Sequence, residues 1–164
     1  MDARCHCGAV RFKTPLAAPL ATYVCHCDTC KSLSSSAFAM SAIFPKFELP
    51  PSELLSCYTC TTDLDGGDIA LPGIPELTFP TGRLFTCCFL PSYFCRNCGT
   101  RVVHSTDAKN VVSVRGGCIS GIDWTKAVHI WTKSAMVPIP ESSESYSENS
   151  SDSSGQGPAQ EVLD

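Results

Sequence analysis

The sequence predicts a mainly β fold built from many short strands. Three observations favour this class. Several short runs are rich in β-branched and aromatic residues, proline and glycine break the chain between these runs, and no long window repeats apolar residues with the period of a helix.

The expected strands follow one another along the chain with turn residues between them. In chain order they are Ala9 to Lys13, Ala37 to Phe44, Leu54 to Thr61, Arg83 to Phe89, Arg101 to Ser105, Val111 to Arg115 and Val128 to Thr132. Proline cannot donate a hydrogen bond within a sheet and glycine favours turns, so these residues mark the boundaries. The separators are Pro15, Pro19, Pro45, Pro50, Pro51, the Asp65-Gly66-Gly67-Asp68 turn, Pro72, Pro75, Pro80 and Gly116-Gly117. Residues 61–80 are expected to form a long surface excursion, of a kind that often serves as a binding loop.

The length of 164 residues suits a single domain, which we expect to span residues 1–140. The run Glu141 to Asp164 contains serine, acidic residues and glycine, and almost nothing apolar. Such a segment cannot bury enough surface to offset the entropy of ordering, so residues 141–164 are predicted to be a disordered tail. The tail is either a solubilising extension or a phosphorylated element that docks a partner, since Ser142, Ser143, Ser145 and Ser147 lie near glutamates.

Charge and composition exclude some classes of function. The net charge of −4 without a basic stripe argues against a nucleic-acid binder. The first residues lack the features of a secretory signal and no apolar stretch approaches membrane-spanning length, so we expect a cytoplasmic protein with no membrane partner. In that reducing compartment the 12 cysteines are expected to hold metal in preference to forming disulfides.

Seven cysteines have the spacing of metal ligands. Four of them come from Cys5-His6-Cys7 and from Cys95-Arg96-Asn97-Cys98-Gly99, where the glycine permits the tight turn of a zinc knuckle. Because zinc prefers four tetrahedral ligands, Cys5, Cys7, Cys95 and Cys98 are expected to form a closed structural site that joins the N-terminal strand to the late part of the sheet.

The other three, Cys25, Cys27 and Cys30, have no equally good fourth partner. Zinc held by three thiolates can accept an external thiolate, so we expect this cluster to be the catalytic site. Two alternatives stay open. One of Cys57, Cys60, Cys87, Cys88 or Cys118 would complete a second structural site, or Cys57, Cys60, Cys87 and Cys88 would bind a third metal. Against the first, Cys57 and Cys60 are three apart in a strand-like run and point to opposite faces.

At these residues the chain resembles the glutathione-dependent formaldehyde-activating enzyme family, which also contains the centromere protein V group. Four motifs carry the resemblance and occur in family order over nearly all of residues 1–140. They are Cys5-His6-Cys7-Gly8-Ala9-Val10-Arg11-Phe12, Cys25-His26-Cys27-Asp28-Thr29-Cys30-Lys31 running to Ser36-Ala37-Phe38, Phe94-Cys95-Arg96-Asn97-Cys98-Gly99, and His129-Ile130-Trp131. Lys31 and Ser35 stand where the family commonly carries arginine and glycine.

The resemblance implies a β-tent fold of short antiparallel strands with two zinc ions. One would be structural at Cys5, Cys7, Cys95 and Cys98, and one functional at Cys25, Cys27 and Cys30. It also implies a carbon-sulfur lyase activity, in which glutathione and formaldehyde form S-hydroxymethylglutathione. The partner would then be a small thiol, with glutathione as the leading candidate.

Several further residues could take part in binding or catalysis, but a structural or surface role is the simpler explanation for each. His6 and His26 are expected at the surface or behind the metal ligands, His129 near the zinc sites as a packing residue, and His104 on a sheet surface. Lys31 and Arg115 could receive the carboxylates of a tripeptide, but we expect them to be solvated surface charges. Trp124, Trp131 and Cys118 are expected to pack in the core or at its rim.

Two functions from different classes therefore compete. The first is a zinc-dependent carbon-sulfur lyase acting on a thiol adduct of formaldehyde or of another small electrophile. The second is a non-catalytic zinc-binding interaction module. The distinguishing feature is the fourth position at the second zinc, which a lyase must exchange and a module can fill permanently.

Overall fold

The computed structural model describes residues 1–59, 91–105 and 110–148. Within them nine strands and one α-helix form the protein, joined by short 3₁₀ turns. The strands are β1 (Asp2–Arg4), β2 (Arg11–Lys13), β3 (Ala21–Cys25), β4 (Ala39–Pro45), β5 (Leu55–Tyr58), β6 (Ser92–Cys95), β7 (Arg101–Ser105), β8 (Val111–Arg115) and β9 (Val128–Ile130). The helix is α1 (Asp28–Ser34), and the 3₁₀ turns are η1 (Ser52–Leu54), η2 (Gly116–Cys118), η3 (Trp124–Lys126) and η4 (Thr132–Ser134).

The mainly β prediction is confirmed. The expected strands Arg101 to Ser105 and Val111 to Arg115 match β7 and β8 residue for residue, and four other expected strands overlap β2, β4, β5 and β9. Strands β1, β3 and β6 and the helix α1 were not expected. The strand expected at Arg83 to Phe89, residues 61–80, Cys60, Cys87, Cys88 and residues 149–164 lie outside the described residues.

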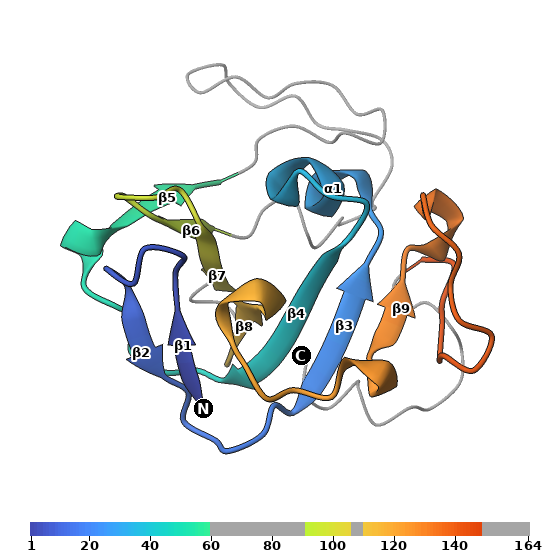
Figure 1. The fold of residues 1–164 in the computed structure, drawn as a ribbon, viewed down its shortest axis with the longest axis horizontal. Coiled ribbons are helices and arrows are strands. Elements are labelled where there is room, and N and C mark those ends of the chain that lie inside the picture. Colours follow the sequence, from blue (N-terminus) through green and yellow to red (C-terminus); the bar gives the residue numbers. More distant parts are fainter. Residues whose placement is uncertain (60–90, 106–109, 149–164) are drawn as a thin grey trace, which may run out of the picture.

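Seven of the strands form one sheet in the order β5-β6-β7-β8-β4-β3-β9, and β1 and β2 pair as a separate hairpin. All neighbours run antiparallel except β3 and β9, which pair in parallel. The prediction of antiparallel strands therefore has one exception, because residues 116–127 lead the chain from β8 past β4 to the far side of β3. Figure 1 shows this sheet crossing the molecule, with the β1-β2 hairpin beside one end and β9 at the other.

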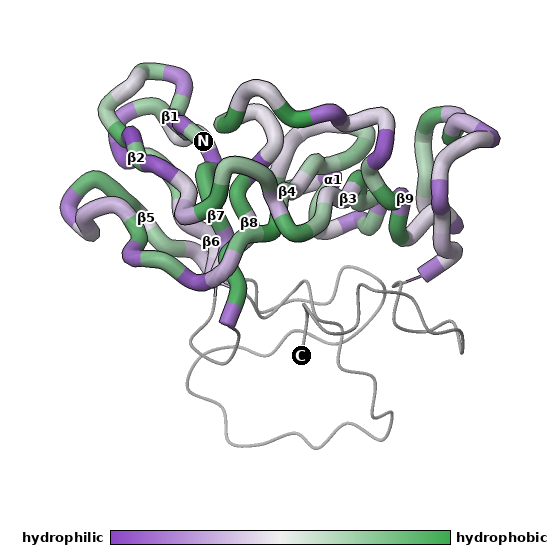
Figure 2. Tube along the Cα trace, turned by 90° about the horizontal axis from the view of Figure 1, so that it is seen from below, coloured by the Kyte–Doolittle hydropathy of each residue, from purple (hydrophilic) through white to green (hydrophobic). Residues whose placement is uncertain are grey.

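The large sheet has two different faces because side chains alternate along a strand. Ala42, Phe44, Val112 and Val114 point to one face and form the main core together with side chains of the hairpin. Figure 2 shows hydrophobic residues concentrated along β7, β8 and β4. Phe44, Val112 and Val114 are completely buried, which makes this face the main source of apolar stabilisation.

Residues 141–148, which the sequence analysis assigns to the tail, pair with the outer edge of β9. The backbone N–H of His129 donates to the carbonyl of Glu144, and the N–H of Tyr146 donates to the carbonyl of His129. Lys133 adds a salt bridge to Glu148 at 2.8 Å. The segment packed on the sheet thus extends past Pro140 and covers an edge that would otherwise expose unpaired backbone groups.

A search of the described residues for a helix long and apolar enough to cross a membrane finds none.

Candidate metal centres

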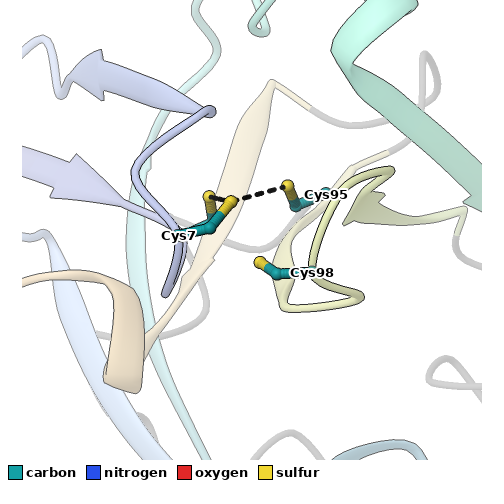
Figure 3. Close-up of side chains that lie close together, drawn as sticks. Cys7, Cys95 and Cys98 are labelled. Carbon is teal, nitrogen blue, oxygen red and sulfur yellow. Dashed lines mark hydrogen bonds between the residues drawn. The ribbon is translucent and has the colours of Figure 1, made fainter.

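The first cluster unites four cysteines from distant parts of the chain. Cys5 and Cys7 lie in the turn between β1 and β2, Cys95 ends β6, and Cys98 lies in the turn before β7. Cys5 Sγ lies 3.5 Å from Cys7 Sγ, and Cys7 Sγ lies 3.8 Å from Cys95 Sγ. Figure 3 shows the sulfurs of Cys7, Cys95 and Cys98 turned toward one another. Sulfurs around a tetrahedral zinc, with bonds of about 2.3 Å, lie about 3.8 Å apart, so this donor set fits the ion.

Local backbone geometry orients these thiols. Gly99 adopts a φ of +72° that favours glycine, and its N–H donates to the carbonyl of Cys95. The N–H of Val10 donates to Cys5 Sγ at 3.3 Å, which supplies the backbone hydrogen bond typical of a knuckle sulfur.

The surroundings shift the pKa values of these thiols in different directions. A hydrogen bond with the Thr100 hydroxyl, at 3.2 Å, is the main reason that the pKa of Cys98 is lowered to about 5. Burial has the opposite effect on Cys95 and raises the pKa of its thiol to about 11. A bound cation would resolve this conflict, because a metal ligand thiol is deprotonated outright.

The second cluster is local in sequence. Cys25 ends β3, Cys27 is the N-cap of α1, and Cys30 lies in the first turn of that helix. Their sulfurs all lie within 4.8 Å of one another, with Cys25 Sγ and Cys27 Sγ 3.5 Å apart. The N–H of Cys30 donates to Cys27 Sγ at 3.4 Å, so the capping interaction also positions a candidate ligand. All three side chains are buried, and among the described residues no fourth cysteine, histidine or carboxylate joins them.

Apolar residues and two histidines surround the second cluster. Ala39, Ile130 and Trp131 pack against the three cysteines. His26, between two of them, is completely buried, and its Nε2 lies 3.0 Å from Nδ1 of His129. Burial is the main cause that lowers the pKa of both histidines, so the pair favours neutral rings.

The other histidines and the two tryptophans lie in the parts of the fold that the sequence predicts for them. His6 is exposed and His104 is half-buried on β7, while Trp131 and Trp124 pack in or against the core. Neither candidate metal cluster in the described part of the chain contains a histidine.

Cys118 is buried, as expected, and its thiol donates to the carbonyl of Arg101. Burial raises its pKa to about 11. Cys57 is exposed on β5, at the opposite edge of the sheet from the second cluster, so neither of these two cysteines completes that cluster. The alternatives that involve Cys60, Cys87 and Cys88 lie outside the described residues.

The expectation that Lys31 and Arg115 are solvated surface charges is wrong. Lys31 has a side chain only 15% exposed, pairs with Asp28 at 2.6 Å and donates to the carbonyl of Ser134. Arg115 is 6% exposed and donates from Nη1 to Ser41 Oγ at 2.8 Å. Ser41 was not expected near the cluster, although its position two residues after Ala39 places it on the face that carries Cys25.

One of three comparisons with known proteins, the family comparison, agrees with the cysteine pattern. Residues 1–66 match the family described as glutathione-dependent formaldehyde-activating enzyme. A crystal structure of a Rhodobacter sphaeroides protein, solved as a structural genomics target, is 20% identical with a TM-score of 0.47, and the alignment covers 75% of this chain and 91% of that one. A search of curated proteins finds no match. The resemblance is thereby confirmed over residues 1–66, which include Cys5, Cys7 and the whole second cluster.

Proposed function

We propose that this chain, whose residues 1–66 belong to the glutathione-dependent formaldehyde-activating enzyme family, is a zinc-dependent carbon-sulfur lyase of the cytoplasm. Its substrates would be a small thiol, with glutathione as the leading candidate, and formaldehyde or another small electrophile. The reaction joins the thiol sulfur to the carbonyl carbon, and the thiol proton ends on the carbonyl oxygen. No oxidant or reductant is needed.

The two cysteine clusters would have different roles, one structural and one catalytic. Cys5, Cys7, Cys95 and Cys98 would hold a structural zinc with every position filled by protein, whereas Cys25, Cys27 and Cys30 would hold a second zinc with three protein ligands. Such a zinc, when bound, supplies a position at which an external thiol is deprotonated near neutral pH.

The chain's own residues would prepare this place for a thiol. Cys27 is fixed by the first turn of α1, and Trp131 and Ile130 keep the cluster in apolar surroundings that limit water. A reactive electrophile held beside the thiol would react within the same complex and would not depend on a diffusional encounter, which raises the rate of bond formation. The contact between buried His26 and half-buried His129 would orient the loop that carries the ligands, since it joins this loop to β9.

One observation carries the proposal: three buried sulfurs converge without a fourth ligand among the described residues. The rival function, a non-catalytic interaction module, would fill that position permanently. Calorimetric titration of the zinc-quantified protein with glutathione tests the two, alongside Cys27→Ser and the matched control Cys57→Ser.

We expect glutathione to bind the native protein and Cys57→Ser but not Cys27→Ser. Nuclear magnetic resonance should then show faster formation of S-hydroxymethylglutathione from glutathione and formaldehyde with the two binding proteins. Two bound zinc ions with no binding of any thiol would refute the lyase and favour the interaction module.

A further inference from the structure

The face of the large sheet opposite the main core carries several buried polar side chains. On β8, Ser113 and Arg115 alternate with the core residues Val112 and Val114, so they point away from the core. Ser41 on β4 pairs directly with Arg115, and on its other side with Tyr23 on β3. A sheet face that is simply a protein surface would expose such residues, yet all four are at most 7% exposed.

Arg115 is the unusual member of this face. Its only hydrogen-bond partner in the described residues is the Ser41 hydroxyl, which is neutral, and no carboxylate there forms an ion pair with it; the one other group that interacts with its charge is the thiol of Cys118. Arginine is almost never fully buried unless it is paired, because desolvating the charge has a high free-energy cost. A bound anion would supply the missing counter-charge.

Ser113 supplies a second, independent observation. Its hydroxyl is buried at 4% residue exposure and has no hydrogen-bond partner in the described part of the chain. It lies two residues before Arg115 on the same strand and therefore on the same face. Native proteins leave few buried polar groups unsatisfied, so this hydroxyl also points to an absent ligand.

This polar face is continuous with the second cysteine cluster. Cys25 lies two residues after Tyr23 on β3 and pairs with Ala39, which lies two residues before Ser41 on β4. Arg115 and Cys25 are thus separated by the single strand β4, roughly 10 Å across the sheet, and by two residues, roughly 7 Å, along the strands. In an extended tripeptide the central residue lies about 5 Å from either end, so the long side chain of Arg115 must reach toward β4 for its guanidinium to meet a carboxylate while the thiol lies at the cluster. The hydrogen bond from Arg115 to Ser41 on β4 shows that the guanidinium does point in this direction.

We propose that Arg115, with the hydroxyls of Ser41 and Ser113, is a carboxylate-binding subsite for the thiol substrate. The guanidinium would hold a carboxylate through charge-assisted hydrogen bonds and so fix the distance between that carboxylate and the sulfur. This inference rests on the proposed function. It makes Arg115 a specificity-determining residue that selects a thiol carrying a carboxylate over a simple thiol.

The test separates carboxylate binding from thiol binding with three probes added to the zinc-loaded full chain. Glutathione offers both groups, S-methylglutathione offers carboxylates with a blocked thiol, and 2-mercaptoethanol offers a thiol without a carboxylate. The variants are Arg115→Met and Arg115→Lys, with Arg4→Met as the matched control because Arg4 is an exposed arginine on the separate hairpin.

We expect Arg115→Met to weaken binding of glutathione and S-methylglutathione by about 10- to 100-fold and to leave 2-mercaptoethanol unchanged. Arg115→Lys should recover part of the loss because it keeps the charge, and Arg4→Met should bind like the native protein. Arg115→Met should also be at least as stable to heat as the native protein, because it removes an unpaired buried charge.

The inference is overturned if Arg115→Met binds S-methylglutathione as the native protein does, or if S-methylglutathione does not bind the native protein. A loss of zinc or of thermal stability in Arg115→Met also overturns it, since the arginine would then serve to balance the cysteine thiolates. Failure of the lyase proposal looks different: S-methylglutathione would still bind through Arg115, while no probe would depend on Cys27.

Discussion

Replacing Cys98 by serine should remove one zinc and destabilise the whole domain. The four-cysteine cluster joins the β1-β2 hairpin to the β6-β7 turn, and Cys7 and Cys95 are 88 residues apart. Closing a loop of that length lowers the entropy of the unfolded chain and so raises its free energy by about 4–5 kcal/mol, by the same argument that applies to a disulfide. A serine hydroxyl does not ionise near neutral pH, whereas the pKa of the Cys98 thiol is lowered to about 5 by its hydrogen bond with Thr100.

The expected loss is large relative to the stability of a domain. The free energy of unfolding of natural domains is about 5–15 kcal/mol. A loss of 1 kcal/mol lowers the Tm of a domain of this size by roughly 2–4 °C. Cys98→Ser should therefore lower Tm by about 8–20 °C, and the zinc content should fall from two ions per chain to one.

Thermal denaturation followed by circular dichroism, together with zinc quantification, measures both effects. Cys57→Ser is the control for the chemical change, because Cys57 is exposed and belongs to neither cluster. Cys27→Ser tests the division of roles and should also lose one zinc, but with a much smaller fall in Tm. The reasoning is refuted if Cys98→Ser keeps two zinc ions and a native Tm, or if Cys27→Ser is destabilised to the same extent.

Three further changes test the packing, each read from urea denaturation. Phe44→Ala should lower the free energy of unfolding by about 3–5 kcal/mol, because a completely buried ring is removed from the core; a loss near zero would contradict this. His129→Ala should lower it by about 1–3 kcal/mol, because buried His26 Nε2 loses its partner, and an unchanged value would argue against the pair. Gly99→Ala should lower it by about 1–2 kcal/mol through the positive φ alone, since no atom lies within 4 Å of the added Cβ; a larger loss would indicate a clash that the structure lacks.

The sequence predicts the cysteine clusters and the longer strands well, for local reasons. Val111–Arg115 is recognisable because three of its five residues are valine, and the CxC and CxxC spacings bring sulfurs together through local geometry. Strand β1 is not recognisable, because three residues carry no period and its strand geometry depends on pairing with β2. Strand β3 does carry a local signal in Thr22, Tyr23 and Val24, but the run is short and its last residue is already part of a cysteine motif, so it was missed.

Burial of the second face of the sheet is the feature that sequence reasoning misses. The alternation in Val111–Arg115 correctly separates Val112 and Val114 from Ser113 and Arg115. It also suggests that the polar pair faces solvent, because polar positions of an antiparallel strand usually do. Whether a polar face is covered depends on tertiary packing, so Arg115 reads as a surface charge in the sequence and is a buried charge in the structure.

The different connectivity of the two clusters supports the proposed division into a structural and a chemical site. The four-cysteine cluster links segments that are 88 residues apart, so its metal would restrict the unfolded chain strongly. Cys25, Cys27 and Cys30 span the end of one strand and one helical turn, where hydrogen bonds already hold the backbone. Their metal would add little restriction, so ligand exchange at its fourth position would leave the rest of the fold undisturbed.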